Sequence, residues 1–310
     1  MHPPQILIAL CSYNGAEWLA GQLDSIAAQD HADWALWISD DGSTDATLAI
    51  IAAFQARHPT RDIRLLQGPR QGGTQNFLSL ICHPELPIGP QTHLALCDQD
   101  DIWLPEKLSR AIALLTAQPD SARPLIYGGQ SRHIDTSGQV VGRSRRPRGQ
   151  VTLQNAVVQN MVSGHSLVLN PSALALARAA GRPAGIGFQD WWLSLLVLAC
   201  GGRAVIDPTE VLLYRQHGGN VMGAPKGATA AKQRLRQMSD GRYRAWIAAN
   251  LAGLAAVADR LTPEAAQIIK SLAQAKGGLA RLHAFRRLGI RRQSGRGTAL
   301  LYTICLLGWA

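Results

Sequence analysis

The chain lacks several features that would assign a protein to a class directly. Its five cysteines are odd in number and include no CxxC pair, which argues against a disulfide framework or a zinc site and fits a reducing cytoplasm. No GxGxxG follows the first apolar run, so a dinucleotide redox cofactor is not expected. No apolar run reaches the ~20 residues of a spanning helix, and no basic segment precedes residues 5–10 as in a signal peptide.

Acidic residues are scarce at one end of the chain. Residues 226–310 carry 15 Lys/Arg and 3 Asp/Glu, whereas residues 1–225 carry 16 and 18, so the net charge of +10 belongs to the C-terminal region. This asymmetry indicates an anionic partner, either nucleic acid or a membrane. The hydrophobic content of 46% is ordinary for a globular protein.

The first two-thirds of the sequence alternate strand-like and helix-like patterns. Apolar runs at 5–10, 34–38, 63–66 and 93–96 predict strands, with helical patterns between them. This alternation predicts a doubly wound, mostly parallel sheet.

After residue 127 the pattern is looser. Residues 128–150 are rich in Gly and Arg and predict a mobile loop. Strands are expected at 166–169 and 211–214, and an apolar helix at 191–199. The Gly-rich residues 218–229 predict the boundary of the first domain.

Two helical stripes follow this boundary. They are expected over 247–261 and 269–285, and Thr262-Pro263 supplies a cap and a first-turn proline between them. The sequence therefore predicts a C-terminal helical hairpin.

A cluster of carboxylates follows the predicted strand at 93–96. Asp98, Asp100 and Asp101 lie where ligands bind in open α/β sheets, and they repel one another unless a cation lies among them. A divalent cation with oxygen ligands, itself carrying phosphates, satisfies this need. The alternative is that Asp100 or Asp101 caps a helix beginning at Pro105.

A second acidic turn ends the predicted strand at 34–38. Asp40 and Asp41 are placed to accept hydrogen bonds from a nucleobase or ribose. Ser43, Thr44 and Asp45, in contrast, are expected only to cap the following helix.

Four motifs in order resemble one family. They are residues 9–15 (ALCSYNG), 39–45 (SDDGSTD), 97–103 (CDQDDIW) and 214–218 (YRQHG). Over about residues 5–223 the chain is similar to the family 2 glycosyltransferases of GT-A fold, most closely to the bacterial rhamnosyltransferase-like branch.

The resemblance implies roles for matching residues on the donor side. Ser12, Tyr13 and Asp40 would hold the nucleobase, and Asp98 would face the ribose. Asp100 would ligate Mg²⁺ or Mn²⁺ bridging the donor diphosphate, with His217 near the diphosphate and metal. For His217 the alternative is a polar residue that merely closes a strand.

The resemblance also places a general base at Asp190. Many relatives have His or Glu immediately before this position, and Gln189 departs from that pattern, so the surroundings of the acceptor stay open. The alternative for Asp190 is a helix N-cap. Gly164 and His165 resemble a loop lining the donor sugar, and Arg215 either faces solvent or binds phosphate.

Arginines and a short apolar run end the chain. Six arginines between 281 and 296 precede residues 299–309, an apolar run about half as long as a membrane span. This pattern predicts a helix lying in the interface of an anionic membrane. The alternative is a terminal helix docked on the protein core; nucleic acid is not favoured because no reading motif accompanies the charge.

Taken together, the sequence predicts an α/β GT-A catalytic domain over 1–223 and a basic helical region over 224–310. The expected function is inverting, metal-dependent transfer of a sugar, L-rhamnose from dTDP-rhamnose, onto a lipid-linked or cell-envelope glycan. The expected location is the cytoplasm, at the inner face of the inner membrane. The alternatives are a UDP-hexose donor, a sugar nucleotidyltransferase, whose glycine-rich basic loop near the first strand is lacking here, and a non-catalytic membrane scaffold, which would not need these acids.

Overall fold

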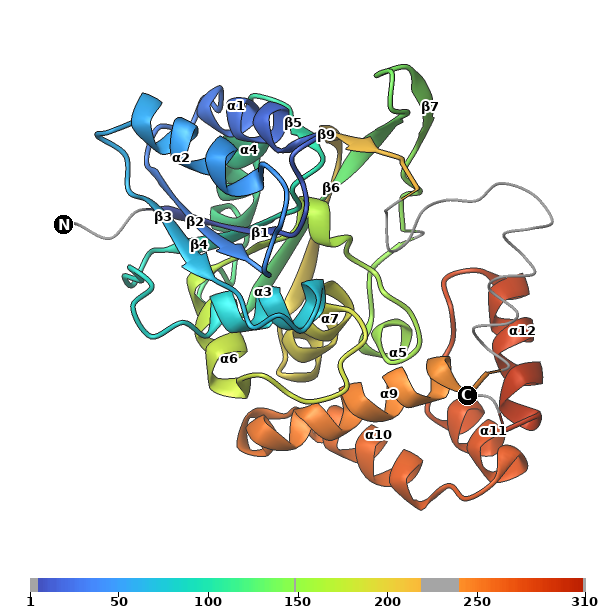
Figure 1. Ribbon diagram of the computed structural model, residues 1–310. Coiled ribbons are helices and arrows are strands. Elements are labelled where there is room, and N and C mark those ends of the chain that lie inside the picture. Colours follow the sequence, from blue (N-terminus) through green and yellow to red (C-terminus); the bar gives the residue numbers. More distant parts are fainter. Residues whose placement is uncertain (1–4, 148, 219–239, 309–310) are drawn as a thin grey trace.

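The computed structural model describes residues 5–147, 149–218 and 240–308 (Figure 1). The strands, in chain order, are β1 (Ile6–Ser12), β2 (Trp34–Asp40), β3 (Ile63–Gln67), β4 (His93–Cys97), β5 (Ile102–Trp103), β6 (Leu125–Ile134), β7 (Val140–Arg143), β8 (Val168–Leu169) and β9 (Arg203–Arg215). The helices of the first 200 residues are α1 (Leu19–Ala27), α2 (Thr47–Arg57), α3 (Gly73–Ile81), α4 (Lys107–Thr116), α5 (Leu153–Ala156), α6 (Pro171–Ala180) and α7 (Gln189–Ala199), with a 3₁₀ turn at Gly164–Ser166.

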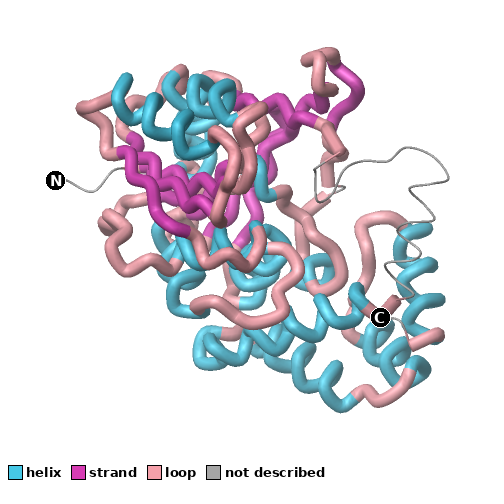
Figure 2. Tube along the Cα trace, in the orientation of Figure 1, coloured by secondary structure: helices cyan, strands magenta, loops and turns pink. Residues whose placement is uncertain are grey.

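All the strands join one sheet in the order β3-β2-β1-β4-β8-β6-β9-β5, with β7 paired to β6. The first four are parallel, as the alternating pattern predicts. Beyond β4 the sheet is mixed: β8 runs antiparallel to β4 and β6, whereas β6 and β9 are parallel. The tube in Figure 2 shows this sheet in magenta with helices on both of its faces.

Alternating side chains of the central strands supply two cores. Ile6, Ile8 and Leu10 of β1 face the cluster that packs under α1, α2 and α4. Leu7 and Ala9 face the larger cluster under α3, α6 and α7. Because both faces are covered, every residue of β1 and β2 is buried, as is usual for parallel strands between helices.

The prediction of a loop over 128–150 is wrong for much of this segment. β6 continues to Ile134 and forms a hairpin with β7, which projects from the body in Figure 1. Its glycines have a packing role: a Cβ on Gly129 would lie 2.4 Å from Val211 of β9, so only glycine lets these two strands approach. Gly129 therefore marks a close strand pair and not a loop.

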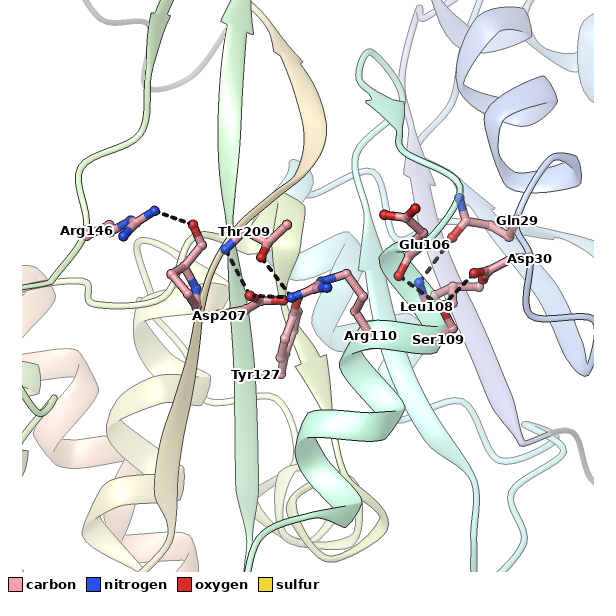
Figure 3. Close-up of polar contacts among 11 residues, drawn as sticks. Gln29, Asp30, Glu106, Leu108, Ser109, Arg110, Tyr127, Arg146, Asp207 and Thr209 are labelled. Atoms are coloured by element: carbon pink, nitrogen blue, oxygen red, sulfur yellow. Dashed lines mark hydrogen bonds and ion pairs between the residues drawn. The ribbon is translucent and has the colours of Figure 1, made fainter.

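Polar contacts fix α4 to its neighbours (Figure 3). The guanidinium of Arg110 donates to both oxygens of Asp207 in β9, at 2.9 and 3.0 Å, and the Tyr127 hydroxyl donates to the same carboxylate. At the N-terminal end of α4, the Leu108 N–H donates to the side chain of Gln29, which follows α1. These bonds hold the chain directly after the acid cluster in place.

The C-terminal region forms more elements than the predicted hairpin. The described helices there are α9 (Arg242–Gly253), a 3₁₀ segment (Leu254–Arg260), α10 (Pro263–Gln274), α11 (Gly278–Arg287) and α12 (Gly295–Leu306). Thr262 caps α10 as predicted, accepting from the Ala265 N–H. The second stripe is interrupted because Gly277, with φ of 84°, separates α10 from α11. The predicted boundary at 218–229 lies almost wholly outside the described residues.

The C-terminal helices belong to the larger core. Phe285 of α11, together with Leu301 and Ile304 of α12, is part of the same apolar cluster as Trp192 of α7. In the described part of the chain, no helix is both long and apolar enough to cross a membrane.

Candidate active site

Three neighbouring parallel strands end at the same edge of the sheet. The register places Ser12 at the end of β1 opposite Asp40 of β2, and Leu10 opposite Cys97 of β4. The polar residues that follow these strands, predicted separately from the sequence, therefore share one edge.

The antiparallel pairing of β5 with β9 adds a second segment to this edge. Ile102 pairs with Leu213, so the chain after β9 returns past the acid cluster. His217 Nε2 lies 2.7 Å from Asp100 Oδ2, and the backbone N–H of Arg215 donates to Asp101 Oδ1 at 3.2 Å. The capping alternative for these acids is not supported, because α4 begins at Lys107 with no side-chain cap.

The indole of Trp18 lies against this returning segment. The Arg215 guanidinium is stacked over its ring at 4.4 Å, and the His217 imidazole at 5.9 Å between centroids. Trp18 precedes α1, so it fixes the end of β9 beside the end of β1. The sequence pattern gave Trp18 no part in the site.

Asp98, Asp101 and His165 form a second group deeper in the site. One ligand atom from each lies within 4.8 Å of the other two. Asp101 Oδ2 and His165 Nε2 are buried and have no hydrogen-bond partner among the described residues. Buried polar atoms of this kind fit a cation or another ligand.

The pKa shifts follow from this crowding. Burial and the nearby charges of Asp100 and Asp190 raise the pKa of Asp98 to about 7. Burial also raises the pKa of Asp101, whereas burial lowers that of His165 to about 3, which keeps the imidazole neutral. A divalent cation near these carboxyl groups would favour their ionised forms.

Lys107 lies beneath the cluster with its side chain fully buried. Its ammonium donates to the His165 carbonyl at 2.8 Å and lies 3.3 Å from the centroid of the Trp103 ring. Burial lowers the pKa of Lys107 to about 7, while Cys97, Asp101 and Asp98 act in the opposite direction. The sequence gave no signal for this residue, since a lysine in the first turn of a helix is normally exposed.

The Asp40 carboxylate is surrounded by donors. Its Oδ2 accepts from the hydroxyls of Ser12 and Ser43 at 2.8 and 2.6 Å, and its Oδ1 from the Gly42 and Ser43 N–H groups. Four donors of the protein itself therefore already occupy this carboxylate. Asp45 accepts from the Thr47 N–H at 3.0 Å, but the N-cap position of α2 is Ala46, so Asp45 is not the cap that was predicted.

Asp41 is buried and holds the loop after β3. Its two oxygens accept from the backbone N–H groups of Arg70 and Gly72 at 2.6 and 2.8 Å. Arg70 has φ of 58°, a left-handed backbone conformation that residues other than glycine seldom adopt, and the bond from its N–H to Asp41 helps to stabilise it. The described contacts of Asp41 are thus with the loop. Its predicted contact with a nucleotide-sugar donor stays a prediction.

Tyr13 lies at the outer rim, with 57% of its surface exposed. Its backbone N–H donates to Gln99 Oε1 at 2.8 Å, and Gln99 Nε2 donates back to the Tyr13 carbonyl. Gln99, the residue between Asp98 and Asp100, thereby ties the acid cluster to the end of β1. The sequence pattern gave Gln99 no role.

Asp190 lies in the first turn of α7 and approaches the site from the other side. Its Oδ2 accepts from the Gly164 N–H at 2.9 Å, beside the His165 carbonyl that Lys107 holds. Burial raises the pKa of Asp190, although hydrogen bonds from the Asn160 side chain and Gly164 oppose that rise. The N-cap position of α7 is Phe188, so Asp190 is not the cap.

Comparisons with known proteins agree with this geometry. The model of Glycosyl transferase family 2 matches residues 7–160. An uncharacterized glycosyltransferase from Nostoc sp. is 32% identical over 245 residues, which cover 75% of this chain and 71% of the relative. The chain belongs to glycosyl transferase family 2.

Two further likenesses bear on this family member. The dTDP-rhamnosyl transferase RfbG from Shigella flexneri is 28% identical over 247 residues, covering 76% of this chain and 81% of the relative. The mannosyltransferase PcManGT from Pyrobaculum calidifontis, solved in complex with GDP-Man and Mn²⁺, superposes with a TM-score of 0.53 at 20% identity. That match covers 98% of this chain and 86% of the other. The fold is that of the GT-A glycosyltransferases, and the protein is a glycosyltransferase.

Proposed function

We propose that this glycosyltransferase moves L-rhamnose from dTDP-rhamnose onto a lipid-linked or cell-envelope glycan, with inversion and with Mg²⁺ or Mn²⁺. The observation that carries the proposal is the pairing of Asp100 with His217, at the strand edge where Asp40 and Asp98 also lie. The rhamnosyl donor is supported by the likeness to RfbG.

Asp100 and His217 would hold the divalent cation. Their side chains are 15% and 18% exposed, so a cation there remains reachable by a donor diphosphate. The deeper Asp98–Asp101–His165 group lies close to Lys107. When Lys107 is protonated, its ammonium would repel a divalent cation bound there. When bound, the cation neutralises the charge that develops on the leaving diphosphate. The mannosyltransferase from Pyrobaculum calidifontis binds Mn²⁺ together with GDP-Man, which supports this cofactor.

The donor would lie along the ends of β1, β2 and β4. Asp40 would accept from the base once a hydroxyl gives way, and the Tyr13 ring at the rim would cover the base. Asp98 would accept from the ribose. The Arg215 guanidinium lies over the Trp18 ring, which also contacts His217, the partner of Asp100, and would face the diphosphate. Gly164 and His165 would line the sugar.

Asp190 would act as the general base. The acceptor hydroxyl oxygen attacks the anomeric carbon, the bond from that carbon to the diphosphate oxygen breaks, and the hydroxyl proton passes to the Asp190 carboxylate. The Gly164 N–H holds one oxygen of Asp190 in position. Asp190 contributes to the raised pKa of Asp98, which supports a location of this base close to the donor side.

A lipid-linked acceptor would place the reaction at the cytoplasmic face of the inner membrane. A UDP-hexose is the second donor to consider, because Asp40 and Asp98 would meet the base and ribose of a uridine nucleotide in the same way.

A donor panel tests the proposed function. The slow hydrolysis of dTDP-rhamnose, UDP-glucose, UDP-galactose and GDP-mannose is measured with Mn²⁺ and without acceptor. We expect dTDP-rhamnose to be cleaved fastest, and cleavage to stop with excess chelator. If a UDP-hexose is cleaved preferentially, the donor is that UDP-hexose and not dTDP-rhamnose. If no nucleotide sugar is cleaved or bound, the proposal is contradicted.

A further inference from the structure

Helix α12 has two apolar faces. On one face Leu301, Ile304 and Cys305 are at most 2% exposed and pack into the core. On the other face Leu300, Leu306 and Leu307 are 43%, 47% and 55% exposed. A terminal helix that only completes the core needs the first face, and the second has no packing role in the described part of the chain.

Helix α11 extends the outward apolar face. Leu279, in its first turn, is the most exposed large apolar residue among those that the structure describes, at 76%. A Cβ on Gly278 would lie 2.3 Å from the Leu306 carbonyl oxygen, so the start of α11 touches the end of α12. Leu279 directly follows this contact, so it belongs to the end of the helix pair where α12 ends. Figure 1 shows both helices at the outer edge of the C-terminal region, away from the sheet.

The segment that carries these leucines is charged with one sign. Residues 265–308 contain eight Lys/Arg and no Asp or Glu. Arg286, Arg291 and Arg296 are exposed on α11, on the connection that follows it and on α12. We define the α11–α12 surface by the exposed residues Leu279, Leu300, Leu306, Leu307, Arg286, Arg291 and Arg296.

We propose that the α11–α12 surface docks on an anionic membrane. Exposed leucines and exposed arginines on the same helix pair fit a lipid interface, where apolar side chains enter the acyl boundary and cations meet the headgroups. A second copy of the chain is disfavoured, since two surfaces without acids repel each other. Nucleic acid would use the arginines and leave the leucines in water.

Docking would orient the catalytic body, by which we mean the sheet and the helices α1 to α7 that cover it. The Tyr302 hydroxyl donates to the Ile290 carbonyl at 3.2 Å, and the Arg244 guanidinium donates to the Gly308 carbonyl at 3.2 Å. These bonds and the buried face fix α12 to the rest of the molecule. The surface is therefore a rigid part of the protein, and contact with lipid sets how the active site is presented. This inference goes beyond the proposed reaction and does not depend on which sugar is transferred.

Vesicle sedimentation of the full chain tests the proposal, with no donor or acceptor present. The vesicles are phosphatidylcholine alone or with phosphatidylglycerol. The test variant carries Leu279→Gln, Leu300→Gln, Leu306→Gln and Leu307→Gln. The matched control carries Leu48→Gln and Leu65→Gln, exposed leucines of the catalytic body at 42% and 37%. A third variant carries Arg286→Gln, Arg291→Gln and Arg296→Gln.

We expect wild type and control to bind the anionic vesicles and to leave phosphatidylcholine vesicles unbound. Partitioning should fall about tenfold or more in the leucine variant and in the arginine variant, and high salt should weaken the wild type. Unchanged vesicle binding in the leucine variant would overturn the proposal. So would a wild-type dimer that the same substitutions dissociate, or wild-type binding to a soluble polyanion with no preference for vesicles. Donor hydrolysis on the same samples reports the catalytic body separately.

Discussion

Asp190 is the residue on which the proposed chemistry depends. Asp190→Asn keeps the size of the side chain and an oxygen for the Gly164 N–H, but it removes proton acceptance. Turnover should fall by about 10²–10⁴, with donor affinity nearly unchanged, because the lost interaction forms only as the acceptor hydroxyl ionises. Steady-state transfer assays and donor titrations measure the two effects.

The pH dependence of turnover provides the control for this variant. Only ionised Asp190 accepts a proton, and its pKa is raised by burial, so wild-type turnover should fall on acidification at a higher pH than an exposed aspartate with pKa ~3.9 would give. The residual activity of the Asn variant should lack this acidic limb. If turnover of the Asp190→Asn variant falls by less than about tenfold, Asp190 has a structural role and is not the general base.

Lys107 makes stability depend on pH. Its folded pKa of about 7 lies below the unfolded value of ~10.4, so above pH 7 the unfolded state binds more protons and stability rises with pH. From about pH 7 to 8.5 this adds about 1.5 kcal/mol to the free energy of unfolding. Lys107→Met should remove this rise, as measured by denaturant unfolding in chelator at both pH values. Equal pH slopes in the two proteins would show that Lys107 is charged in the fold.

At the scale of secondary-structure elements, we expect the loop after β3 to contribute to nucleotide binding. Asp41→Asn leaves one acceptor oxygen where the loop after β3 now has two, and the Asn amide must face a backbone N–H of Arg70 or Gly72. Leaving a buried donor unpaired costs about 1–3 kcal/mol. We expect lower stability and a weaker nucleotide affinity, measured by thermal unfolding and calorimetry. Glu85→Gln, an exposed position on the loop before β4, is the control. Unchanged nucleotide affinity would mean that the loop does not contact the donor.

Prediction from sequence succeeded for elements with a local signal. The apolar runs near 34–38 and 93–96 marked their strands, and Thr262-Pro263 marked the start of α10. It failed where long-range pairing decides. Gly129 was interpreted as part of a loop because the strand that requires it, β9, lies some 80 residues later in the sequence.

The same limit applies to the candidate site. The acids at 98 and 100 were found because they cluster in the sequence. Trp18, Gln99 and Lys107 were missed because their partners are distant: Lys107 meets His165 only through the fold. His217 was placed near the metal by family resemblance, and the β5–β9 register supplies the physical reason for its contact with Asp100.

The whole molecule shares one large core between the catalytic body and the C-terminal helices. Phe285→Ala in α11 should therefore cost about 3–5 kcal/mol and lower the temperature at which helical signal and donor hydrolysis are lost together. His283→Ala, at an exposed position of the same helix, should leave both unchanged. Loss of helical signal with hydrolysis intact would mean that the C-terminal helices unfold as a separate unit.

Metal-dependent donor binding is the central claim, and calorimetry tests it most directly. The full chain is titrated with dTDP-rhamnose in Mn²⁺ and in excess chelator, alongside Asp100→Asn. The account predicts binding to the wild type with Mn²⁺, and binding weakened by at least about tenfold in chelator and in the variant, because in both cases no cation is held between the protein and the diphosphate. Equal affinity under all three conditions would contradict it.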